Sequence, residues 1–271
     1  MKLRMLSKRM PLPQAVAVKS LPHKLILGVP VAVTTMSEAV DTIGRWIAGR
    51  ESRYVCASDV HSIMRAQETA SHMEALNAAD MVVPDGMPVV WASRLYGAAK
   101  AQRVCGPDLM LAVCERSLTT GWTHYFYGGA EGVADVLAEK LRTRYPGLKV
   151  VGTDCPPFRP LTDGETQAAL QRINDAAPDI VWVGLGCPKQ EAWMLKHRPD
   201  LPGKTLVGVG AAFDFHTDRV KRAPVWMQNS GLEWAHRLAS EPRRLWRRYL
   251  LQAPRFVFAS LREWISGSAR T

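Results

Sequence analysis

Residues 79–88 read ADMVVPDGMP, and the fold class can be inferred from this segment. Its apolar run, 80–84, has the length and composition of a short strand. A carboxylate at Asp85 and a glycine at Gly86 follow at once, and Pro88 suits the first turn of a helix. A strand, a tight turn and a helix start within one short segment predict a strand–helix unit of a parallel sheet.

The same alternation continues outward from this segment, from Lys24 to about residue 212. We expect strands at 25–33 with a hairpin at Gly28, and at 53–57, 80–84, 123–127, 148–152, 179–184 and 204–209. We expect helices at 36–49, 60–77, 87–96, 107–119, 131–144, 163–176 and 188–197. Strands that alternate with helices predict an α/β fold with a parallel sheet covered by helices.

The net charge of +10 is concentrated at the two ends of the chain. Residues 1–24 hold six basic side chains and no acidic one, and residues 236–271 hold eight arginines against Glu241 and Glu263. A near-neutral body with basic ends predicts contact with a polyanion, either a membrane surface or a nucleic acid. No nucleic-acid-binding motif accompanies the charge, so a nucleic-acid-binding protein is only a remote alternative.

The last third of the chain changes character, because tryptophan and arginine accumulate there without strand patterns. Apolar residues recur every three or four positions over 241–265, which predicts an amphipathic helix with a kink at Pro254. Such a helix can pack on the core or lie at a membrane interface with its tryptophans at headgroup depth. The longest apolar stretches are too short to span a bilayer.

Glycine-rich turns and polar residues follow the predicted strands, where ligands bind in open parallel sheets. The turns contain Gly128 and Gly129, then Gly186 with Lys189 and Gln190, and finally the 210–214 turn that ends at Asp214. Such turns are typical of sites for a nucleotide or another phosphorylated ligand. GxGxxG, GxxxxGK[ST], GxSxG and Asp-x-Asp motifs are absent, which argues against dinucleotide folds, P-loop NTPases and α/β-hydrolases. The five cysteines form no CxxC pair and no zinc-finger spacing.

Six segments in a fixed order carry a resemblance to a known family. They are ADMVVPDGMP (79–88), RVCGPDLM (103–110), GLGCPKQE (184–191), GVGAAFD (208–214), KRAP (221–224), and LEWAHRL with EPRR (232–238 and 241–244). On these motifs the chain resembles the WecG/TagA/CpsF glycosyltransferase family over residues 24–258. The resemblance implies a Rossmann-like parallel sheet with helices on both faces and a short, helical, basic C-terminal appendage. We expect a flexible basic leader at 1–23, a catalytic core at 24–220 and a membrane-associating appendage at 221–271.

The resemblance also implies the chemistry. Family members transfer a sugar from a UDP-sugar to a polyprenyl-diphosphate-linked saccharide with inversion, without cofactor or bound metal. Asp85 then corresponds to the general base, Arg103 and Gln190 to substrate-binding residues, and Arg237, Arg244 and Arg247 to appendage arginines that complete the site at the membrane. With the strand-end residues, the expected substrate-binding set is Ser58, Asp59, Arg103, Asp108, Gly128, Gly129, Gly186, Lys189, Gln190 and Asp214. We expect a peripheral protein on the anionic cytoplasmic face of the inner membrane. The oligomeric state stays open, a homo-oligomer included.

One stretch departs from the family pattern. Many members carry Thr-x-Asn after the second predicted strand, where this chain has Ala57, Ser58 and Asp59. Ala57 has no hydroxyl and Asp59 offers only acceptor oxygens, which argues against an N-acetylmannosamine donor. The stretch is more similar to the exopolysaccharide branch, so glucose is the expected sugar. An N-acetylmannosaminyl or N-acetylmannosaminuronyl group is the alternative.

Overall fold

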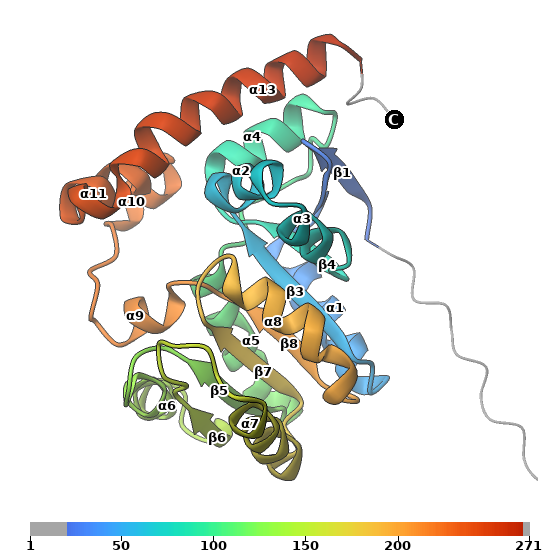
Figure 1. The fold of residues 1–271 in the computed structure, drawn as a ribbon, viewed down its shortest axis with the longest axis vertical. Helices are drawn as coiled ribbons and strands as arrows, with labels where there is room; N and C mark the ends of the chain where they lie inside the picture. The colour runs from blue at the N-terminus through green and yellow to red at the C-terminus, as the bar shows by residue number, and fades with distance from the viewer. Residues whose placement is uncertain (1–20, 268–271) are drawn as a thin grey trace, which may run out of the picture.

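The computed structural model describes residues 21–267 and confirms the α/β fold (Figure 1). Eight strands form one sheet in the order β1-β2-β4-β3-β8-β7-β5-β6, and all neighbours except the β1–β2 hairpin pair in parallel. The strands are β1 (His23–Ile26), β2 (Val29–Ala32), β3 (Arg53–Ser58), β4 (Met81–Pro84), β5 (Thr123–Gly128), β6 (Lys149–Asp154), β7 (Ile180–Gly184) and β8 (Thr205–Gly208). Most of the predicted leader, residues 1–20, lies outside the described residues.

The hairpin expected at Gly28 is confirmed. Leu27 and Gly28 join β1 to β2, and both have positive φ, 49° and 78°. Two successive positive φ values are what a two-residue turn needs to match the twist of the paired strands.

Helices cover both faces of the sheet. They are α1 (Met36–Ala48), α2 (Val60–Glu68), α3 (Ala70–Asn77), α4 (Met87–Leu95), α5 (Gly106–Thr120), α6 (Val133–Arg144), α7 (Asp163–Ala176), α8 (Lys189–His197), the 3₁₀ turn η1 (Arg198–Asp200) and α9 (Ala212–His216). Helices α1, α5, α6 and α9 pack on one face, and α2, α3, α4, α7 and α8 pack on the other.

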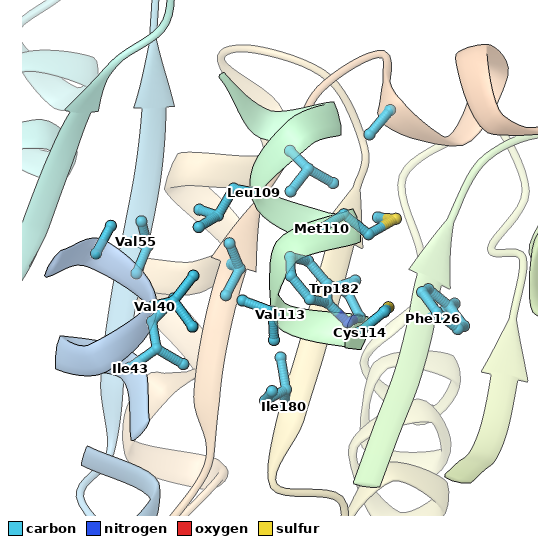
Figure 2. Close-up of a cluster of buried hydrophobic side chains, with 14 of the residues drawn as sticks. Val40, Ile43, Val55, Leu109, Met110, Val113, Cys114, Phe126, Ile180 and Trp182 are labelled. Atoms are coloured by element: carbon cyan, nitrogen blue, oxygen red, sulfur yellow. The ribbon is translucent and has the colours of Figure 1, made fainter. Parts of the chain in front are cut away.

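Side chains along the central strands alternate between these two cores. In β3, Val55 packs with α1 and α5, whereas Tyr54 and Cys56 point to the opposite layer. Figure 2 shows the first core, in which Trp182 of β7 and Phe126 of β5 lie against α5. Because the central strands are buried on both faces, their sequences read as continuous apolar runs, which made them visible in the sequence.

The helix predicted for 60–77 is two helices, a difference with a local cause. Thr69 adopts an extended conformation, with φ −138° and ψ 106°, which interrupts the helical hydrogen-bond ladder. The carbonyl of Thr69 then accepts the N–H groups of His72 and Met73, so α3 starts anew from this residue. The break places His72 and Leu76 in the interior.

The C-terminal segment is helical, as expected, but it is divided differently. It contains α10 (Val225–Asn229), α11 (Glu233–Ser240), α12 (Pro242–Trp246), the π-helical turn η2 (Arg247–Gln252) and α13 (Ala253–Ile265). We expected a simple kink at Pro254, but the helix instead widens into the π turn η2, which ends two residues before this proline. Proline lacks an N–H and its ring crowds the preceding turn, so local widening relieves the conflict.

Helix α13 lies beside α2 and α4 (Figure 1). Phe256 and Ser260 on its inner face are 2% and 4% exposed, so this part of the chain is docked on the core. Within residues 21–267, no helix has both the length and the apolar character that crossing a bilayer requires.

Candidate functional site

Asp85 lies in the turn between β4 and α4, at the carboxyl edge of the sheet. Its N–H donates to the carbonyl of Ser58 at 2.9 Å, and its Oδ2 accepts the N–H of Gly106 at 3.4 Å. Burial raises the pKa of Asp85 to about 6, against the opposing influence of Arg103 and the Gly106 N–H. A carboxylate with this pKa is largely ionised at neutral pH and is a stronger base than an ordinary aspartate.

The amino end of α5 reaches Asp85 because residue 106 is a glycine. A Cβ on Gly106 would lie 2.7 Å from the carbonyl oxygen of Val209, which follows β8. The close approach aims the Gly106 N–H at the carboxylate. The partial positive charge at the amino end of a helix also makes this position favourable for an anionic ligand.

Arg103, next to Asp85, is held by two carboxylates. Its guanidinium donates to Asp108 at 3.2 Å and to Glu233 of α11 at 3.0 Å. Arg222 also binds Asp108 in a bidentate manner and lies 3.4 Å from Glu233. Burial alone would raise the pKa of Asp108, but hydrogen bonds from Arg222 and Cys105 outweigh it and the pKa is lowered. The network joins the core to α11.

Arg237 of α11 completes this cluster. Its positive charge acts on Asp85, and its guanidinium lies 5.2 Å from the centre of the Phe215 ring. Its Nε is buried and has no hydrogen-bond partner among the described residues. A buried N–H without a partner is costly, so this atom is ready to bind an incoming acceptor.

Glycines 128 and 129 allow two strand ends to meet. A Cβ on Gly128 would lie 2.6 Å from the backbone of Gly184, and the N–H of Gly129 donates to the Gly184 carbonyl at 3.0 Å. Both glycines have positive φ, 129° and 80°. Close packing of β5 on β7 therefore requires these glycines, whether or not they also contact a phosphate.

The Gly186–Gln190 turn has an exposed part and a buried part. Gly186 has open space around its Cβ position, and Lys189 is exposed at the start of α8. Gln190 is only 1% exposed, its Oε1 accepts the Gly210 N–H at 3.1 Å, and its Nε2 donates to Glu191 at 2.9 Å. Gln190 thus holds the Gly210 turn in place, and the substrate contact expected at this residue stays a prediction.

The stretch that departs from the family pattern has a structural role here. Ser58 is fully buried and faces Ser62. Asp59 caps α2 by accepting the Ser62 N–H at 3.0 Å, and its other oxygen forms an ion pair with Arg248 of the appendage. The carboxylate at position 59 is therefore explained by docking of the appendage.

Of the remaining predicted residues, Asp214 and Arg247 lie outside the hydrogen-bonded cluster around Asp85. Asp214 in α9 is 3.7 Å from Arg219 and is partly exposed. Arg247 stacks on the ring of Trp246, at 5.3 Å, on the exposed side of η2. Arg244 belongs to α12, but its side chain lies outside the described part of the structure.

Sequence reasoning missed three residues at the site. Arg222 and Glu233 lie inside segments that we singled out, KRAP and LEWAHRL, yet nothing in their local pattern pairs them with Arg103 or Asp108. Arg248 is one of the eight arginines counted in residues 236–271, and nothing in its local pattern pairs it with Asp59. Two histidines near strand ends, His124 and His216, have structural contacts instead: with Ser117 and Trp182, and with the carbonyl of Pro107.

The cluster combines a base with three cations at one edge of the sheet. Arg103, Arg222 and Arg237 face Asp85, Asp108 and Glu233, so three positive and three negative groups balance. The arrangement can deprotonate a hydroxyl at Asp85 and bind an anionic group through guanidinium groups nearby. An anion that binds Arg103 or Arg222 competes with the carboxylates these residues already contact, whereas Arg237 Nε has no such competitor among the described residues.

Comparisons with known proteins agree with the motifs. A sequence model described as the glycosyl transferase WecG/TagA/CpsF family matches residues 24–270. A relative from Bacillus spizizenii is 32% identical over 200 residues, which is 73% of this chain and 74% of the relative. That relative is named as an N-acetylglucosaminyldiphosphoundecaprenol N-acetyl-beta-D-mannosaminyltransferase.

Proposed function

The chain belongs to the WecG/TagA/CpsF family of glycosyltransferases, and we propose that it transfers an N-acetylmannosaminyl group from a UDP-activated donor to a polyprenyl-diphosphate-linked N-acetylglucosamine. The observation that carries this proposal is the Asp85 cluster at the carboxyl edge of the sheet. It places one basic carboxylate beside guanidinium groups from both the core and α11.

Asp85 is the general base. It accepts the proton of the acceptor hydroxyl while that oxygen attacks the anomeric carbon and the bond to the diphosphate breaks. Direct displacement by one nucleophile inverts the anomeric centre. The pKa of about 6 keeps Asp85 ionised at neutral pH and brings its basicity close to the operating pH.

Arg103 and Arg237 stabilise the departing diphosphate. Arg103 is bound by Glu233 before substrate arrives, so the donor phosphates compete with this carboxylate for the guanidinium. Arg237 has an unpartnered, buried Nε ready for a phosphate oxygen. Donor binding therefore loosens a contact between the core and α11 and replaces it with contacts to the diphosphate.

The name of the relative supports an N-acetylmannosaminyl donor in place of glucose, the sugar that the departure at residues 57–59 led us to expect. No comparison supports glucose, and the named relative transfers N-acetylmannosamine. The ion pair between Asp59 and Arg248 supports this preference, because it gives position 59 a role other than donor selection. Ala57 remains the one observation that favours glucose.

The acceptor brings the protein to a membrane surface. Large apolar side chains are exposed along the appendage, among them Trp226 (64%), Phe258 (71%) and Ile265 (76%). Arginines lie on the same segment, and Trp234, Trp246 and Trp264 are 38–42% exposed. Basic residues with exposed aromatic and aliphatic side chains favour binding to an anionic leaflet, here the cytoplasmic face of the inner membrane.

The test is transfer from a panel of UDP-sugars to N-acetylglucosaminyl-diphospho-polyprenol in anionic vesicles. We expect labelled N-acetylmannosamine to enter the lipid fraction faster than glucose or N-acetylglucosamine does. Preferred transfer of glucose would reject the donor assignment and keep the glycosyltransferase. Hydrolysis of donor without a lipid product would reject the acceptor.

A further inference from the structure

Three potential metal ligands from distant parts of the chain meet in the layer below the sheet edge. They are His72 in α3, Cys187 in the turn after β7, and Glu191 in the first turn of α8. One ligand atom from each lies within 4.8 Å of the other two. His72 and Glu191 are 2% and 0% exposed, so the cluster is built into the interior.

The His72–Cys187 distance suits two ligands of a tetrahedral ion. His72 Nε2 and Cys187 Sγ are 3.6 Å apart. With Zn–S of about 2.3 Å and Zn–N of about 2.0 Å, tetrahedral angles place two such ligands about 3.5 Å apart. The Glu191 carboxylate lies within 4.8 Å of both atoms, and Ser62 Oγ lies 3.1 Å from the same His72 nitrogen.

Two polar atoms of this cluster have no hydrogen-bond partner within residues 21–267. Glu191 Oε1 accepts a hydrogen bond from Gln190, but Oε2 is buried and unpaired, and so is His72 Nδ1. A buried carboxyl oxygen without a donor or a cation is unfavourable, so a ligand for it is expected.

We propose that His72, Cys187 and Glu191 bind one Zn²⁺ ion that ties α3 to the turn between β7 and α8. Mixed nitrogen, sulfur and oxygen ligands favour zinc, whereas Mg²⁺ and Ca²⁺ require oxygen ligands. On binding, the Cys187 thiol and the Glu191 carboxyl each release a proton to solvent. Their two negative charges then balance the two positive charges of the ion.

The ion has a structural role separate from the Asp85 cluster. Glu191 neighbours Gln190, whose Oε1 holds the Gly210 N–H at 3.1 Å. Zinc bound to Glu191 therefore also fixes the neighbouring Gln190, whose side chain joins the start of α8 to the Gly210 turn at the sheet edge. It binds no diphosphate and takes no part in deprotonating the acceptor.

The test is metal binding by the full chain, without any activity assay. We expect one zinc per chain after dialysis, and a sulfur-to-cobalt charge-transfer band after cobalt replaces zinc. Cys187→Ser should abolish the band and weaken zinc affinity about tenfold or more, by analogy with the loss of a supporting ligand contact. Cys155→Ser, which changes another partly exposed cysteine outside the cluster, should leave both unchanged.

Two results would overturn the site. One is a metal-free wild-type chain that takes up neither zinc nor cobalt. The other is equal zinc binding by wild type and by Cys187→Ser, which marks binding elsewhere. If Cys187→Ser fails to fold, the cobalt band of the wild type and its loss in His72→Gln decide the question.

Discussion

The forces that stabilise the core differ from those that hold the appendage on it. Central strands of the core are buried on both faces, with Val55, Trp182 and Leu206 all at 0% exposure. The appendage buries few large side chains, chiefly Leu245 and Phe256, and leaves most of its apolar residues exposed. Apolar burial stabilises in proportion to the area removed from water, whereas a segment anchored by few side chains is easier to detach.

Polar contacts supply the rest of the attachment. Arg248 pairs with Asp59, Gln252 contacts His61 at 2.7 Å, and Glu263 accepts the Tyr96 hydroxyl at 2.7 Å. Together with Glu233 at Arg103, these contacts lie along one side of the core. The difference suggests that the core folds as the cooperative unit and the appendage docks on it, bringing Arg237 to a base that the core already holds.

The largest effect should come from the core. Asp85→Asn removes the base and keeps the shape of the side chain, so transfer should fall by about 10²–10⁴. UDP affinity should change little, because the amide replaces only the proton acceptor. Transfer kinetics and calorimetric UDP titration measure the two effects. Unimpaired transfer would remove Asp85 from the mechanism, and lost UDP binding would make it a binding residue.

A single cation of the appendage, Arg237, should contribute nearly as much to the transfer rate. Arg237→Ala removes a guanidinium aimed at developing negative charge, so the transfer rate should drop by about 10²–10³. Arg255→Ala is the matched control, because this arginine of α13 is exposed and has no predicted role in the site. Equal losses in both variants would show that the appendage acts through its overall charge and not through Arg237.

A pair of cavity variants tests whether the appendage is a separate unit. Ile43→Ala in the core should lower the free energy of unfolding by about 2–5 kcal/mol. Phe256→Ala should cost a similar amount locally, and hydrogen exchange should then speed up in α13 while β3 and β7 stay protected. Urea denaturation measures the free energy of unfolding of both variants, and hydrogen-exchange mass spectrometry shows which helices and strands lose protection. Faster exchange throughout the sheet in Phe256→Ala would place α13 inside the cooperative core.

These contrasts explain how much the sequence could predict. The sheet was predictable because β3, β7 and β8 are apolar runs followed by turn residues, and Asp85 was predictable because it follows such a run. The split at Thr69 was not, since only the extended backbone of one residue causes it. The ion pairs of Arg222 and Glu233 join positions more than one hundred residues from their partners, and no local pattern encodes that distance.

Gln190 shows a second limit of local sequence patterns. Its motif and its place after β7 predict a substrate contact, but they do not predict the buried hydrogen bonds that its side chain makes with Gly210 and Glu191. A strand-end position indicates which residues gather at the edge of the sheet. Whether a side chain points to the ligand or into the core depends on neighbours that the local sequence does not name.

The pH dependence should identify the core base by a smaller, graded effect. A raised pKa means that the base form is lost as the pH falls through about 6, so kcat/KM should decline below this value. The free energy of unfolding should change in the opposite sense. The Asp85 carboxyl keeps its proton up to about pH 6 in the folded protein but only up to about pH 3.8 in the unfolded chain. This proton therefore favours folding at low pH, and that stabilisation is lost as the pH rises from about 3.8 to about 6.

Asp85→Asn is the control for both effects. Its residual activity should lack the decline near pH 6, and its stability advantage over wild type should grow as the pH rises from 4 to 6. A decline that persists in the variant would assign the titration to another group.

The smallest expected effect concerns the contact that the unusual residue 59 makes with the appendage. Arg248→Gln removes the ion pair and leaves the helix cap at Asp59 intact, since the cap uses the other carboxylate oxygen. For a partly exposed pair, docking should weaken by about 1 kcal/mol or less, and added salt should narrow the difference from wild type. Hydrogen exchange in η2 and α13 at low and high salt measures it, with Arg255→Gln as an exposed control. A salt-independent loss much larger than this would mean that Arg248 anchors the appendage through packing, and the division between an apolar core and a polar attachment would fail at that point.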